Sequence, residues 1–163
     1  MQRGRWAGRS GFLSTLSQDG TFSGTVPGGG SFLYTCRSAS YTAGPGEIAI
    51  IWSWASVDAP SGYSLGVRAG YDNGSGDQTL GYNGIDWNNT GAYGWLNNSQ
   101  TGVLPLTAGA SYTFSTAVHS DLGGSYGVGS TCYCHTLVVI AKATSVAAAS
   151  PINAPQLAPA VRR

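Results

Sequence analysis

Two cysteines and a histidine lie close together near the end of the chain, in the stretch GSTCYCHTLVVIAK at 129–142. These residue types could hold a metal ion, form a redox pair or pack in a strand. On a strand, Cys132 and Cys134 point to one side and His135 to the other. Zinc sites take four ligands in sets such as C-x2-C, whereas this spacing is C-x-C with one further cysteine and one further histidine. We therefore expect no metal site.

The cysteines leave two other interpretations open. They could be buried thiols that pack as small apolar side chains. Alternatively, Cys36 could form a disulfide with Cys132 or with Cys134, which would leave one thiol unpaired. The start of the chain, MQRGRWAGRSGF, shows no apolar core of a secretion signal, and this favours thiols.

Enzyme motifs are weak in this sequence. The stretch GGSYG at 123–127 matches the pattern around a nucleophilic serine, but that motif needs a helix after it and here a strand pattern follows, so Ser125 is predicted to be a loop serine. The stretch DNGSGD at 72–77 lacks the glutamate of a calcium loop and is predicted to be a solvated turn. Five aspartates could supply a carboxylate pair for glycoside cleavage, but nothing selects a pair. We predict a non-enzymatic protein with no cofactor.

Alternation of apolar and polar residues with period two dominates the middle of the chain. In SYTFSTAVH at 111–119, Tyr112, Phe114, Thr116 and Val118 share one face. Stretches of this kind are separated by Gly and Pro, and about eight to ten short strands are indicated. No stretch shows helix spacing with caps. The expected fold is all-β, an antiparallel β-sandwich that is jelly-roll-like, with extended N- and C-terminal arms.

Charge and proline set the two ends apart from this body. Five of the eight basic residues lie at the ends, and the stretch between them keeps three cations against all seven acids, a net charge of −4. The predicted division is a basic arm at 1–10, a sandwich body at 11–143 and an Ala/Pro-rich arm at 144–163. The arm residues expected to act in assembly are Arg3, Arg5, Arg9, Pro151, Pro155, Pro159, Arg162 and Arg163. Apolar runs are too short for a membrane span, and neither a membrane nor nucleic acid is an expected partner.

Aromatic residues are concentrated in the glycine-rich segment 70–102, which we expect to be loop-like. Such residues could belong to the core, contact another protein or stack on sugar rings. The candidate contact residues are Tyr71, Tyr82, Trp87, Tyr93 and Trp95.

The closing stretch, LPLTAGASYTFSTAVHS followed by GSTCYCHTLVVIAK, resembles the ends of β-sandwich domains of bacteriophage virion proteins. The resemblance implies a structural part of a virus particle, a capsid decoration or tail accessory protein assembled in the host cytoplasm. Such proteins are commonly trimeric and attach to other virion proteins through terminal arms. No functional residue carries over. The alternative is a carbohydrate- or receptor-binding module that meets a host glycan or receptor with the aromatics of 70–102.

Overall fold

The computed structural model describes residues 12–81, 87–88, 94–122 and 124–143. Among them, no helix is long and apolar enough to cross a membrane. These residues form twelve strands: β1 (Phe12–Phe22), β2 (Thr25–Val26), β3 (Leu33–Thr35), β4 (Tyr41–Thr42), β5 (Glu47–Ala59), β6 (Ser64–Asp72), β7 (Asp77–Thr79), β8 (Trp87–Asn88), β9 (Gly94–Pro105), β10 (Ser111–His119), β11 (Tyr126–Gly127) and β12 (Cys132–Lys142).

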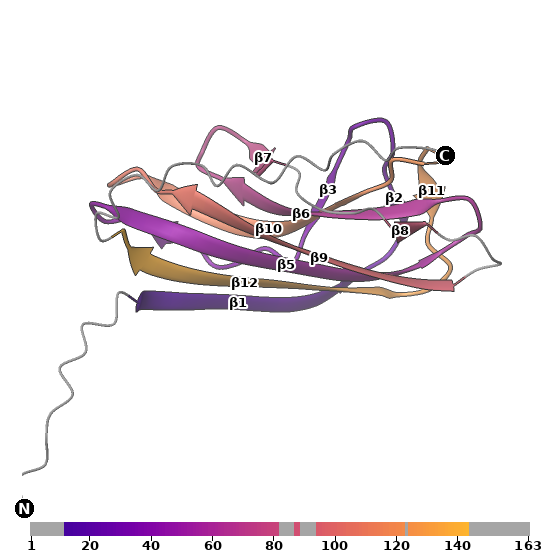
Figure 1. Ribbon diagram of the computed structural model, residues 1–163, viewed down its shortest axis with the longest axis horizontal. Helices are drawn as coiled ribbons and strands as arrows, with labels where there is room; N and C mark the ends of the chain where they lie inside the picture. The colour runs from indigo at the N-terminus through magenta and orange to yellow at the C-terminus, as the bar shows by residue number, and fades with distance from the viewer. Residues whose placement is uncertain (1–11, 82–86, 89–93, 123, 144–163) are drawn as a thin grey trace, which may run out of the picture.

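Ten of the strands make two stacked sheets (Figure 1), and β2 and β11 pair in a separate two-stranded sheet. A four-stranded sheet has the order β1-β12-β5-β9, and an opposing sheet has the order β3-β10-β6-β7, with β4 added to β10 and β8 to β6. Every strand pair is antiparallel, and the chain crosses between sheets from β5 to β6 and from β9 through β10 to β12. The predicted all-β antiparallel sandwich of jelly-roll type is confirmed.

Alternation along the strands predicted which side chains share a face. Tyr112, Phe114 and Val118 of β10 are buried, and so are Cys132 and Cys134 of β12, while Tyr133 between them is exposed. Because side chains alternate across a strand, one face of β12 supplies the core. In β10 the other face is covered as well, and Ser115, Ala117 and His119 are also buried.

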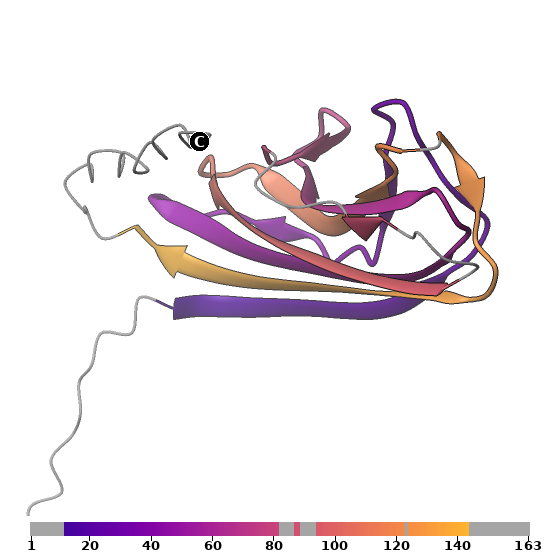
Figure 2. The ribbon, with the colours of Figure 1, turned by 45° about the vertical axis from the view of Figure 1, so that its right-hand side comes forward.

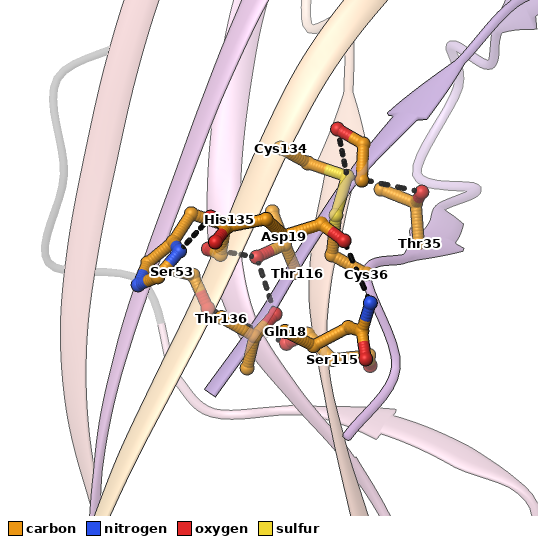
Figure 3. Close-up of a disulfide and its surroundings, with 11 residues drawn as sticks. Gln18, Asp19, Thr35, Cys36, Ser53, Ser115, Thr116, Cys134, His135 and Thr136 are labelled. Carbon is orange, nitrogen blue, oxygen red and sulfur yellow. Dashed lines mark hydrogen bonds and ion pairs between the residues drawn. A yellow bond between two sulfur atoms is a disulfide. The ribbon is translucent and has the colours of Figure 1, made fainter. Parts of the chain in front are cut away.

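The core has two apolar halves with a polar layer between them. One half surrounds Phe114, and the other surrounds Leu65. In the polar layer between the two halves, the Thr116 hydroxyl donates to the His135 carbonyl at 2.8 Å (Figure 3). The Thr136 hydroxyl lies 2.8 Å from the Thr116 hydroxyl. Since Thr116 has one hydroxyl proton, Thr136 is the donor of the second bond. These buried hydroxyls are satisfied and join the two sheets.

A disulfide between Cys36 and Cys134 also joins the two sheets (Figure 3). Cys36 follows β3 of the opposing sheet, Cys134 lies on β12, and 98 residues separate them along the chain. The interpretation of these two residues as free thiols is therefore wrong. Cys132 is the free cysteine of the described chain; it is fully buried, and burial raises the pKa of its thiol.

Glu47 forms a polar anchor at the end of the four-stranded sheet where β5 begins. Its carboxylate accepts hydrogen bonds from the Tyr41 hydroxyl and the Gly44 N–H, both at 2.7 Å, and lies 3.7 Å from the Lys142 ammonium. Only 8% of the side chain is exposed. The Gly44 N–H, then the Tyr41 hydroxyl and Lys142, hold the pKa of Glu47 below its usual value despite burial. The charged form of Glu47 therefore stabilises the fold.

Glu47→Gln is expected to lower the free energy of unfolding by about 1–3 kcal/mol at neutral pH, as hydrogen bonds to a charged acceptor are lost. A depressed pKa means that the wild-type advantage is present above the unfolded-state pKa, about 4.3. This advantage disappears as the pH falls through the lower folded-state pKa. Urea unfolding of the wild type and of Glu47→Gln at a series of pH values measures the difference between their free energies of unfolding. A difference that stays constant as the pH is lowered would contradict the role of the charge.

Candidate functional site

The outer face of the four-stranded sheet carries apolar side chains that the opposing sheet does not cover. The register places Pro105, Ile48 and Ala141 in one row across β9, β5 and β12, and Val103, Ile50 and Val139 in the next. We call this surface the apolar band; it comprises Phe12, Ile48, Ile50, Trp52, Val103, Pro105, Leu137, Val139 and Ala141. Val103 is 57% exposed and Phe12 66% exposed, so the band faces outward.

The apolar band ends at a row of polar and aromatic groups. The Trp52 ring lies 5.4 Å from the ring of His135, and the His135 Nδ1 is paired with the Asp19 carboxylate on β1. Asp19 is largely exposed, whereas the His135 side chain is mostly covered. This row separates the apolar band from a second surface nearer the start of β12.

The second surface contains two aromatic side chains that contact each other across β5. Trp95 lies on β9 and Tyr133 on β12, and their ring centroids are 6.0 Å apart at an interplanar angle of 32°. Each side chain is 49% exposed. Beneath them on β5, Ser56 pairs with Tyr133 and is buried, and Asp58 pairs with Trp95. We call Ser56, Asp58, Trp95, Asn97 and Tyr133 the aromatic end.

The structure does not bring the sequence-predicted contact aromatics together where it describes them. Trp95 lies on the outer face of the four-stranded sheet, whereas Tyr71 lies on β6 of the opposing sheet, with its ring 6.5 Å from Tyr112 and its hydroxyl donating to Gln78 at 2.8 Å. Both lie on strands, not in loops. Trp87 lies in β8, and its backbone pairs with that of Leu65 in β6.

The remaining predicted residues fall outside the described part of the chain. This applies to the contact aromatics Tyr82 and Tyr93 and to all the arm residues: Arg3, Arg5, Arg9, Pro151, Pro155, Pro159, Arg162 and Arg163. Attachment through the arms therefore stays a prediction.

The weak enzyme and calcium motifs have structural roles. The Ser125 hydroxyl accepts the Gly28 N–H at 2.9 Å, which joins two loops. Asp72 accepts the N–H groups of Gly74 and Gly76 at 2.7 and 3.1 Å, so it closes its own turn. Within the described ranges, no group of three or more His, Cys, Asp or Glu residues could hold a metal ion.

The two histidines make contacts that do not activate a nucleophile. The buried His119 ring lies 4.7 Å from Phe32, accepts the Arg68 Nε–H at 3.3 Å and lies 3.1 Å from Asp121; burial lowers its pKa. Neither imidazole, among the residues that the structure describes, is hydrogen-bonded to a serine, threonine or cysteine side chain. A nucleophile activated by histidine requires such a contact.

Sequence reasoning missed the apolar band, although one signal pointed to it. In EIAIIWSWASV at 47–57, Ile48, Ile50, Trp52 and Trp54 alternate with Ala49, Ile51, Ser53 and Ala55. Both sets are largely apolar, which is typical of a strand that is covered on both faces. In a sandwich of two layers only one set can face the opposing sheet. Ala49, Ile51, Ser53 and Ala55 are buried there, so the set that begins with Ile48 faces outward, and no element of the described chain covers it.

No family model and no curated protein matches the chain. Among solved structures, the chain is similar to murine APRIL, a TNF-family protein with a jelly-roll β-sandwich, crystallised at pH 5.0. The match has a TM-score of 0.40 and 9% sequence identity, and it covers 77% of this chain and 99% of that chain. It concerns the fold alone.

The comparisons correct the interpretation of the closing stretch as that of a bacteriophage virion protein. The structural match is to a mouse protein, and no phage protein is named. The stretch LPLTAGASYTFSTAVHS has a structural role in the sandwich, because it forms the end of β9, a turn and β10. Apolar alternation and a glycine turn recur wherever such strands are joined, so they do not identify a virus.

Proposed function

We propose that the protein is a structural subunit that associates with copies of itself through the apolar band. The observation that carries this proposal is the row-by-row apolar register across β9, β5 and β12 on a face that no other element of the described chain covers. Exposed apolar patches of this kind mark protein contacts.

The size of the outer face that holds the band supports self-association. Neighbouring strands are about 4.8 Å apart and rise about 3.3 Å per residue, so the face of all four strands over the eight residues Glu47–Trp54, the band and the polar side chains of β1 beside it, covers about 500 Å². Two such faces bury about 1,000 Å² together, the area that a specific interface needs. A second copy provides a face of the same shape and polarity, as symmetric oligomers require.

Val103→Asp is expected to weaken self-association by about tenfold or more, because an unpaired carboxylate would be buried at the contact. Val103 is 57% exposed in the single chain, so the substitution should leave the fold intact. Sedimentation equilibrium and light scattering over a range of concentrations measure the effect.

The matched control is Leu122→Asp, since Leu122 is 48% exposed in the segment after β10, away from the band. It should associate like the wild type. Equal association of the Val103 variant and the wild type, or a wild-type protein that stays monomeric at every concentration, would refute the proposed function.

A further inference from the structure

We propose that the aromatic end is a binding site for neutral carbohydrate, with the Trp95 and Tyr133 rings as its platform. The site is separate from the apolar band: Trp95 and Val103 are eight residues apart on β9, about 27 Å along the strand. The inference therefore does not depend on self-association.

The two rings form a preformed surface. They come from strands on opposite sides of β5 and lean together over Ser56, which is 7% exposed although it faces outward. The contact between the rings fixes both side chains before any ligand arrives, and this reduces the entropy lost on binding. The ring planes are inclined at 32° to each other, and about half of each residue is exposed, so both rings can be reached from outside.

Polar groups surround this platform on three strands. Asp58 follows Ser56 on the same face of β5, and its carboxylate makes no hydrogen bond to any residue within the described ranges. Asn97, the next outward residue of β9, is exposed, and Thr21 on β1 lies opposite Tyr133 and is exposed. The rim thus offers a carboxylate acceptor, an amide and a hydroxyl, which can both donate and accept.

A pyranose ring matches this arrangement. One of its faces consists of C–H groups that pack on an aromatic ring, and its edge carries hydroxyls that both donate and accept hydrogen bonds. The Asp58 carboxylate accepts from hydroxyls and disfavours an anionic ligand. A cationic ligand is the competing fit, but cation sites surround the ammonium with ring faces, and a cation cannot use the donors of the rim.

Saturation-transfer NMR on the full chain tests the proposal with three probes: cellotetraose, chitotetraose and mannotetraose. We expect transfer to the ring C–H protons of at least one of them. Trp95→Ala and Tyr133→Ala should each raise its dissociation constant about tenfold or more, as loss of one stacking ring does. Asp58→Asn should weaken binding less, and Trp95→Phe, which keeps a ring, should retain part of it.

Two controls separate this site from the apolar band. Trp52→Ala removes an exposed aromatic of the band and should bind the sugar like the wild type. Val103→Asp should also bind it, which keeps failure of self-association distinct from failure of this site. The proposal is overturned if none of the probes receives transfer, if binding survives Trp95→Ala, or if only a cation such as tetramethylammonium binds in a manner that depends on Trp95.

Discussion

Replacing Cys36 and Cys134 together by serine should lower the free energy of unfolding by about 4–5 kcal/mol, the value for a bridge that closes about 100 residues. The residues are 98 apart in sequence, so the bridge removes much freedom from the unfolded chain. Serine hydroxyls can be accommodated there, because the Thr35 hydroxyl lies 3.3 Å from the Cys134 sulfur. The effect is large because the bridge closes a long loop of the unfolded chain.

Urea unfolding with and without a strong phosphine reductant measures this effect in the wild-type protein as well. Reduction should destabilise the wild type by the same amount as the double substitution and should leave the double variant unchanged. The matched control is Cys132→Ser, which keeps the bridge and should show the full sensitivity to reductant. A wild-type protein whose stability does not respond to reduction would show that the bridge does not form.

Phe114→Ala is expected to cost about 3–5 kcal/mol, as for other fully buried phenylalanines. Its side chain is completely buried, and its ring stacks on Tyr112 with centroids 6.0 Å apart and planes within 8°. The backbone there is fixed in place, since the Phe114 N–H donates to the Ser38 hydroxyl and its carbonyl accepts the Ser38 N–H. The surroundings therefore cannot collapse to fill the space.

Phe114→Leu is the control, and it should cost less than about 1.5 kcal/mol because it keeps most of the volume. A loss below about 1 kcal/mol for Phe114→Ala would contradict tight packing in this half of the core. The disulfide and Phe114 lie in different halves of the core, with the Thr116–Thr136 layer between them. Their effects should therefore add to within about 0.5 kcal/mol.

The alternation of apolar and polar residues predicted those features of the fold that depend only on residues close together in the sequence. The sets of side chains that share a face of β10 and of β12 were correct because alternation alone decides which side chains point the same way. The fold class was correct because many short alternating segments with glycine turns fit few other architectures. The same logic placed Tyr133 and His135 on one side of β12, opposite Cys132 and Cys134.

Contacts between distant residues could not be predicted in this way. Whether Cys36 meets Cys134 depends on how two sheets stack, and the two residues are 98 positions apart in the sequence. The aromatic end could not be predicted for the same reason. Trp95 and Tyr133 come close only because β9 and β12 each pair with β5 in a particular register. Trp95 was singled out because of its residue type, but Tyr133 was counted only as part of a strand.

Phe12 at the start of β1 lies opposite Ala141, just before the end of β12 (Figure 2). The described body therefore begins and ends at adjacent positions. A short linker between these positions should permit circular permutation, with new termini opened in the exposed turn at Ser61 and Gly62. Such a rearranged chain would carry a fluorophore or an affinity handle at the new termini, at the other end of the sandwich from Phe12 and Ala141.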